Sequence, residues 1–212
     1  MKLRLFIFGL FFILSAGSLF ANVVPQTSED IPSNTIGLYQ TDERIVVYEK
    51  PDKSSKMLSD KQINYSMMLG AKFDNMFAVL IPEKNLGYLY VTDTSDDENW
   101  VLVIYDKSKN LKGWAYKRDE FQFFPWINFY DMYGRKYGLS RFKNSKVNEI
   151  HSQPDENSQI IGEMTVPKQI KLTSIEGNWA LVTAVDTGYS ANTGYVQWRD
   201  SAGRFYMFPA MK

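Results

Sequence analysis

Three short motifs occur twice in this sequence in the same order, and this duplication limits the possible folds more than any other feature. They are a Pro-Asp pair, an Asn-Trp-x-Leu-Val stretch, and a Gly-aromatic segment followed by Arg-Asp. Their positions are 51–52 and 154–155, 98–103 and 177–182, and 113–119 and 194–200. Ser55 and Ser158 keep the offset of 103 residues that separates the Pro-Asp pairs (51 to 154). Ordered repetition of this kind predicts two copies of one structural unit.

Each motif is typical of a small antiparallel sheet. The Pro-Asp pairs predict turns, because proline presets its φ and the aspartate can hydrogen-bond the backbone just ahead. Residues 100–105 and 179–184 are rich in β-branched and aromatic side chains and are bounded by polar segments, as strands are. Residues 106–112 and 186–193 then predict hairpin turns. The fold class expected is therefore all-β.

The second copy resembles the bacterial SH3-like domain family over residues 147–207. The resemblance lies in the turn proline with its serine and an aliphatic-Gly pair, the strand at 170–173, the Gly-Asn-Trp-x-Leu-Val stretch and the closing Gly-Tyr-Val. Gln153 replaces the usual glycine before the turn proline and Tyr195 replaces the more common tryptophan, changes that concern ligand preference more than fold. The resemblance implies two small SH3-like antiparallel barrels in tandem. It also implies recognition of peptidoglycan peptides or of protein partners.

The first copy, residues 46–120, contains an insertion. From Asp52 to Trp100 is 48 positions, whereas from Asp155 to Trp179 is 24. The extra residues include two apolar runs, 77–81 and 88–92, joined by a Pro-containing turn. They predict a strand, a turn and a strand, and hence a longer sheet or a protruding hairpin in the first copy.

The chain divides into five parts on these grounds. They are a signal peptide at 1–21, a flexible N-terminal segment at 22–35, a first SH3-like domain at 36–120, an aromatic interdomain segment at 121–137 and a second SH3-like domain at 138–212. The interdomain segment is too aromatic for a solvated linker, so we predict that it packs between the domains. An exposed aromatic patch that binds sugars or a partner is the alternative.

The N-terminus predicts export. Lys2 and Arg4 precede an apolar run at 5–14, and small residues then lead to Ala21, where we place the signal-peptidase cut. This apolar run is shorter than a membrane-spanning helix, which needs about 20 residues. A cut slightly earlier and an uncleaved anchor are the alternatives. No comparable run follows, so we expect a periplasmic or secreted protein with no stable membrane insertion after cleavage.

The absence of cysteine limits the chemistry. With Cys 0 the chain has no disulfide, no thiolate metal site, no cysteine nucleophile and no lipoprotein attachment point. Its stability must come from an apolar core, which 44% hydrophobic residues permit. Without Lys2 and Arg4 the chain has 22 basic and 24 acidic residues. This balance argues against nucleic acid as a partner.

No catalytic or metal-binding motif is present. His151 is the only histidine, and because it follows the apolar Ile150 we expect it on the exposed face of its strand, without the partners of a Ser-His-Asp triad. The acidic run at 93–98 lacks the glycine and glutamate of an EF-hand and predicts a solvated loop. We predict no cofactor. Five cations are expected in solvated turns, or alternatively in contact with anionic wall polymer: Lys107, Lys109, Lys112, Lys117 and Arg118.

The leading functional hypothesis is a non-catalytic binding protein of the cell envelope that recognises a cell-wall peptide or an envelope protein through grooves lined by tyrosine and tryptophan. The predicted ligand-binding residues are Tyr48, Trp100, Trp114, Trp179, Tyr195 and Trp198. For each of them, packing in the core is the alternative. Two other functions stay open: a cell-wall hydrolase using carboxylates such as Asp97, Glu98 or Asp186, and an envelope inhibitor or assembly factor whose inserted hairpin, 77–92, contacts one protein.

Overall fold

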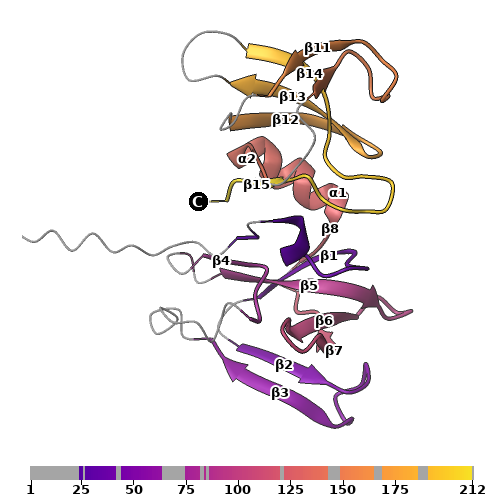
Figure 1. The fold of residues 1–212 in the computed structure, drawn as a ribbon. Helices are drawn as coiled ribbons and strands as arrows, with labels where there is room; N and C mark the ends of the chain where they lie inside the picture. The colour runs from indigo at the N-terminus through magenta and orange to yellow at the C-terminus, as the bar shows by residue number, and fades with distance from the viewer. Residues whose placement is uncertain are drawn as a thin grey trace, which may run out of the picture.

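The protein consists of two antiparallel sheets with a short helical segment between them (Figure 1). The computed structural model describes residues 24–25, 27–41, 44–63, 75–81, 84, 86–119, 122–142, 149–164, 169–185 and 191–211. The predicted signal peptide, 1–21, lies outside these residues. The described part of the chain confirms the all-β fold class. No helix in it combines the length and the apolar character needed to cross a membrane.

The first sheet is built from the N-terminal half of the chain. Its strands are β1 (Gly37–Thr41), β2 (Arg44–Tyr48), β3 (Met57–Gln62), β4 (Val79–Ile81), β5 (Leu86–Thr94), β6 (Trp100–Asp106), β7 (Leu111–Tyr116) and β8 (Phe123–Pro125). They are ordered β3-β2-β7-β6-β5-β1-β8, with β4 paired to β5. β-Branched and aromatic residues make up most of β5 and β6, which explains why these segments form the long central strands.

The second sheet is built from the C-terminal half. Its strands are β9 (Leu139–Arg141), β10 (Glu149–His151), β11 (Ile160–Glu163), β12 (Gln169–Glu176), β13 (Trp179–Val185), β14 (Ala191–Gln197) and β15 (Met207–Pro209). They are ordered β11-β10-β14-β13-β12-β9-β15. Taken strand by strand, this is the order of the first sheet without β4. The two halves therefore share one topology, as the repeated motifs predict.

The turns of the two halves also correspond. Ser55 donates its backbone N–H to the carbonyl of Asp52 (3.0 Å), and Ser158 does the same to Asp155 (3.1 Å). The Ser55 hydroxyl bonds to the carbonyl of Lys50 (3.1 Å), as Ser158 bonds to that of Gln153 (3.0 Å). The Pro-Asp pair and the serine that follows it are thus the sequence signal of this turn.

The predicted barrels are open sheets. In the described residues neither strand path returns to its first strand, since β3 and β11 each pair with one strand only. The end of the first domain also shifts, because β8 pairs with β1 in the first sheet just as β15 pairs with β9 in the second. These two strands share a Phe-Pro dipeptide, at 124–125 and 208–209. Each repeat thus ends at that dipeptide, and β8 belongs to the first repeat rather than to the predicted interdomain segment.

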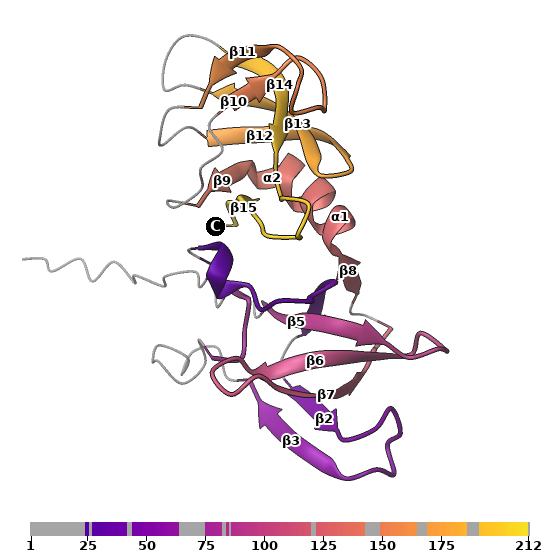
Figure 2. The same cartoon turned by 45° about the vertical axis from the view of Figure 1, so that its right-hand side comes forward.

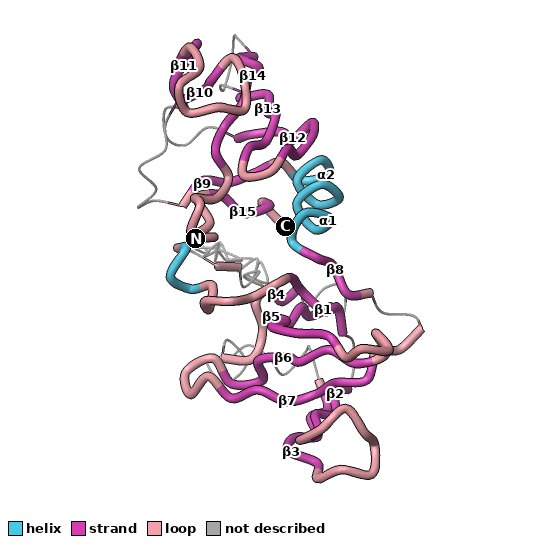
Figure 3. Tube along the Cα trace, turned by 90° about the vertical axis from the view of Figure 1, so that its right-hand side faces the viewer, coloured by secondary structure: helices cyan, strands magenta, loops and turns pink. Residues whose placement is uncertain are grey.

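The helical segment consists of α1 (Trp126–Phe129), the π-helical turn η4 (Tyr130–Gly134) and α2 (Arg135–Tyr137). It lies between the two sheets with β15 beside it (Figure 2; Figure 3). Trp126, Phe129 and Tyr130 are buried in one apolar cluster that includes Leu38 of the first sheet and Val182 of the second. This confirms the predicted interdomain packing, and it means that the two halves share a core.

This core also bears on the inserted hairpin and on the N-terminal segment. The inserted hairpin does not protrude, because β4 and the adjoining part of β5 are buried, with Phe77 and Tyr90 each 0% exposed. It lengthens the sheet, which is the first of the two predicted alternatives. The N-terminal segment, for which we predict flexibility, contacts the core at two points: the 3₁₀ turn η1 (Ser28–Asp30) leads to the buried Ile31, and Trp126 Nε1 donates to the carbonyl of Thr35 (2.9 Å).

Candidate ligand-binding site

The six predicted ligand-binding residues fall into two surface groups and one core residue. Trp198 is the core residue. It is 0% exposed, its ring centroid lies 4.6 Å from that of Tyr130, and its Nε1 donates to the carbonyl of Gly177 (3.0 Å). The prediction that Trp198 lines a surface groove is therefore corrected, because its ring packs against the helical segment.

The first surface group lies on the outer face of the first sheet. Tyr48 of β2 packs edge-on against Trp100 of β6 (ring centroids 5.7 Å apart), and Trp100 packs edge-on against Tyr116 of β7 (5.2 Å). Trp114 is half-buried and is the cross-strand partner of Tyr48. Trp100 is only 6% exposed, whereas Tyr116 is 40% exposed. Trp100 is thus the base of this aromatic cluster, and Tyr116 is its accessible ring.

Sequence reasoning missed Tyr116 although the signal was present. Side chains alternate between the two faces of a strand, so Tyr116, two residues after Trp114, had to lie on the same face. It also missed Lys53, whose ammonium lies 3.7 Å from the centroid of the Tyr116 ring. Lys53 follows the Pro-Asp pair within the turn between β2 and β3, and its ammonium reaches the end of β7. Its contact with Tyr116 is a cation–π pair.

The second surface group is the equivalent of the first in the second sheet. His151 replaces Tyr48, and its ring lies 5.0 Å from that of Trp179 in an edge-on arrangement. Tyr195 is the cross-strand partner of His151, as Trp114 is of Tyr48. The two groups lie at opposite ends of the molecule, near β2 and β10 (Figure 2).

His151 is not exposed, contrary to expectation. It is on the opposite face of β10 from Ile150, as predicted, but it is only 4% exposed because the Trp179 ring covers that face. Its Nδ1 lies 3.4 Å from the Ser158 hydroxyl and its Nε2 lies 3.4 Å from a Glu149 carboxylate oxygen. The arrangement resembles a Ser-His-Glu triad in composition. However, the Ser158 hydroxyl also donates to the turn, with the carbonyl of Gln153 at 3.0 Å. Ser55 makes the matching contact with the carbonyl of Lys50 (3.1 Å) in the first sheet, where no histidine is involved, so the serine has a structural role in the turn.

A small cavity of about 220 Å³ adjoins the aromatic cluster of the first sheet. It forms because β2 and β7 pair at only one position, Tyr48 with Trp114, and diverge beyond it. Aromatic, aliphatic and cationic side chains surround it. They are Tyr39, Tyr48, Tyr116, Ile45, Val46, Ala115, Thr41, Arg44, Lys53 and Arg118. The Tyr39 hydroxyl donates to the carbonyl of Tyr116 (3.3 Å) and accepts from the N–H of Arg118 (3.2 Å), which fixes the end of β7 against the cavity.

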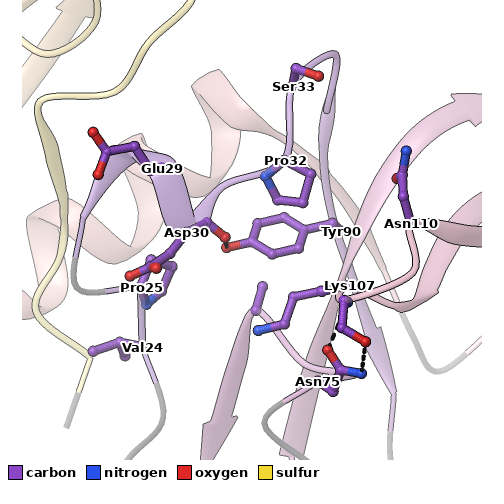
Figure 4. A pocket seen from close by; sticks show the side chains of 12 residues that line it. Val24, Pro25, Glu29, Asp30, Pro32, Ser33, Asn75, Tyr90, Lys107 and Asn110 are labelled. Atoms are coloured by element: carbon purple, nitrogen blue, oxygen red, sulfur yellow. Dashed lines mark hydrogen bonds between the residues drawn. The ribbon is translucent and has the colours of Figure 1, made fainter.

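A larger cavity of about 550 Å³ lies between the N-terminal segment and the far end of the first sheet (Figure 4). Its polar side chains bond mainly to the protein itself. Asn75 bonds twice to Ser108, Lys107 donates to the carbonyl of Phe77 (2.8 Å), and the Tyr90 hydroxyl donates to the carbonyl of Asp30 (3.2 Å). Burial raises the pKa of Tyr90, so the phenol stays protonated as a donor. The bond of Tyr90 with Asp30 joins the N-terminal segment to the sheet. Lys107 is half-buried rather than fully solvated.

Of the carboxylates suggested for hydrolysis, Asp97 is the one whose hydrogen bonds the structure defines. Asp97 accepts hydrogen bonds from the Ser95 hydroxyl (2.6 Å) and from the N–H and side chain of Asn99. These bonds, that of Ser95 most, lower the pKa of Asp97 to about 2. Such a carboxylate stays ionised and does not serve as a proton donor near neutral pH. Glu98 is exposed in the same turn, and Asp186 lies outside the described residues.

Asp97 should make the turn before β6 sensitive to acid. Its pKa is lower in the folded than in the unfolded chain, so its stabilising effect is present above the unfolded value of about 3.9 and is lost as the pH falls toward 2. We expect Asp97→Ala to lower the free energy of unfolding at pH 6 and to have much less effect at pH 2. Urea unfolding at both pH values measures this. An equal loss at both would show that the ionised carboxylate does not hold the turn.

The fold and the site together define an all-β protein with two copies of one strand arrangement, a shared aromatic core and an aromatic cluster on the outer face of each copy. A comparison with models of known protein families found no match, and a comparison with curated proteins found none either.

Proposed function

We propose that this chain is a non-catalytic binding protein, exported to the cell envelope, that recognises a cell-wall peptide or an envelope protein on the outer face of its first sheet. The carrying observation is the aromatic cluster beside the small cavity. Trp100 supports Tyr48 and Tyr116 from below, and Tyr116 presents a ring that is 40% exposed. Rigid, half-exposed tyrosine rings bury a large area at low entropic cost, and for this reason they are enriched at binding surfaces.

The second sheet supports a lesser role in binding. At the position of Tyr116 it has Gln197, and at that of Tyr48 it has the buried His151. The second copy thus lacks the accessible ring and keeps only Trp179 and Tyr195, both half-buried. Export is the part of the proposal that the N-terminal sequence motif supports, through the basic, apolar and small-residue segments of residues 1–21.

Tyr116→Ala should weaken binding to the envelope ligand at least about tenfold, since truncating an accessible aromatic anchor costs more than about 1.4 kcal/mol at a binding hot spot. The measurement is sedimentation of the chain lacking residues 1–21 with isolated cell-wall sacculi, beside capture from an envelope extract. Leu111→Ala is the matched control, because Leu111 is on the same strand and is 39% exposed but lies outside the cluster. We expect it to bind as the parent chain does.

Tyr116 is a better probe than Trp100. Trp100 is almost fully buried beneath the cluster, so its truncation would cost about 3–5 kcal/mol of stability and confuse binding with folding. Circular dichroism and the unfolding midpoint of Tyr116→Ala should match those of Leu111→Ala. Unchanged retention of a folded Tyr116→Ala variant by both ligand preparations would refute the proposed site.

A further inference from the structure

The two equivalent sites differ in charge. The two sites have different residues at three equivalent positions. At two of them the second site has a glutamate, and at the third it has a glutamine in place of an aromatic residue. The pairs are Val46 and Glu149, Lys53 and Glu156, and Tyr116 and Gln197. All six residues are among those that the structure describes, and both glutamates are exposed. Because the backbone arrangement is the same, the second site serves as an internal comparison for the charge of the first.

The cavity of the first site has cationic side chains and apolar walls. Arg44, Lys53 and Arg118 line it, and none of its described lining residues is acidic. Ile45 and Ala115 are almost fully buried and form its apolar wall. Its volume is about 220 Å³. Pockets that bind a whole small ligand are larger, at about 300–1,000 Å³. The cavity fits one side chain of a longer molecule.

Lys53 is the cation best placed to act on a ligand. Its ammonium lies 3.7 Å from the centroid of the Tyr116 ring and is not paired with a carboxylate of the described residues. Arg44, by contrast, is already paired with Asp60 through two hydrogen bonds of 2.8 and 2.6 Å, which lower the pKa of Asp60. The ammonium of Lys53 therefore remains a positive charge at the mouth of the cavity, held beside the accessible ring.

We propose, building on the binding function above, that the first site recognises an acidic peptide and that a glutamate or aspartate side chain of this peptide enters the cavity. Its carboxylate lies at Lys53, its methylene groups pack on Ile45 and Ala115, and the adjoining peptide groups lie along Tyr48 and Tyr116. A short apolar stem ending in a carboxylate matches both the walls and the charge. The second site, with Glu149 and Glu156, repels the same peptide.

The test compares two blocked peptides that differ in one group: acetyl-Ala-Tyr-Glu-Ala-Ala-amide and the same peptide with glutamine. Each is titrated into the ¹⁵N-labelled chain lacking residues 1–21, and amide chemical shifts are followed. We expect the glutamate peptide to shift the amides of Lys53 and Tyr116 at a concentration at least about tenfold lower than the glutamine peptide. The amides of Glu156 and Gln197 should not move.

Lys53→Glu should abolish the preference for glutamate. Lys56→Glu is the matched control, because Lys56 is exposed in the same turn but does not line the cavity, and it should keep the preference. Equal titrations by the two peptides, or an unchanged preference in Lys53→Glu, would overturn the proposal. So would inorganic polyphosphate that competes at these amides at a lower concentration than the glutamate peptide, since it would assign the site to a phosphate polymer.

The outcomes separate this proposal from the binding function on which it rests. If the charge variants bind sacculi or envelope extract as the parent chain does while Tyr116→Ala does not, the aromatic site stands and the acidic-peptide assignment fails. If Tyr116→Ala is also retained, the site itself is wrong.

Discussion

Phe129→Ala should destabilise both halves of the protein together, by about 3–5 kcal/mol. Phe129 is 0% exposed, and its ring lies 5.9 Å from Tyr88 of the first sheet and 5.6 Å from Phe208 of the second (centroid to centroid). Truncation leaves a cavity bordered by both sheets. For a chain of this size the midpoint of thermal unfolding should fall by roughly 6–20 °C. Calorimetry should show one transition in the parent chain and in the variant.

Ile127→Ala is the control for this prediction. Ile127 lies two residues away on the same helix but is 49% exposed, so its truncation should change the stability by less than about 0.5 kcal/mol. Hydrogen exchange then locates the effect. Amides of β5 and of β13 should lose protection to the same extent in Phe129→Ala. A loss confined to one sheet would mean that the two halves unfold independently despite their common core.

The sequence predicted the repeat and its strands because those features are local. Strand Trp100–Asp106 and strand Trp179–Val185 follow from β-branched and aromatic runs, and the turns follow from Pro-Asp with a serine three residues after the aspartate. The Phe-Pro dipeptide at the end of each repeat was also readable. It was missed because its first copy lies inside the aromatic run at 121–137 that was assigned to the interdomain segment.

The sequence did not predict which residues of the outer faces are buried, because this depends on contacts between distant parts of the chain. Alternation placed His151 on the correct face of its strand, but it could not show that Trp179, 28 positions later, covers that face. The prediction that Trp198 lies in a surface groove was wrong for a related reason. Its ring is buried against Tyr130 of the helical segment, and this contact joins two segments that are far apart in the sequence. The cavity beside Tyr116 depends on the divergence of β2 from β7, which no local pattern encodes.

The glycine of each Gly-aromatic motif has a steric role that leads to the second large prediction. A Cβ at Gly113 would lie 2.3 Å from Val47 Cγ1 and 3.0 Å from the Tyr48 carbonyl oxygen, and one at Gly194 would lie 2.4 Å from Ile150 Cγ2 and 2.8 Å from the carbonyl oxygen of His151. Beside Val47 and beside Ile150, the neighbouring edge strand, β3 or β11, also has one extra residue. We expect Gly113→Ala and Gly194→Ala each to destabilise by about 1–3 kcal/mol, because the added methyl overpacks a core.

A double-mutant cycle separates this crowding from a general intolerance of substitution. Val47→Ala removes Cγ1, the atom nearest to the added methyl at Gly113. The double variant with Gly113→Ala should therefore be more stable than the sum of the two single losses predicts, by about 0.5–3 kcal/mol. Gly177→Ala, which meets no atom within 4 Å but has a φ of +57°, should show no such coupling with Val47→Ala. Strict additivity at Gly113 would show that the loss there comes from the backbone, and that the repeated glycine does not serve the close contact of β7 with β2.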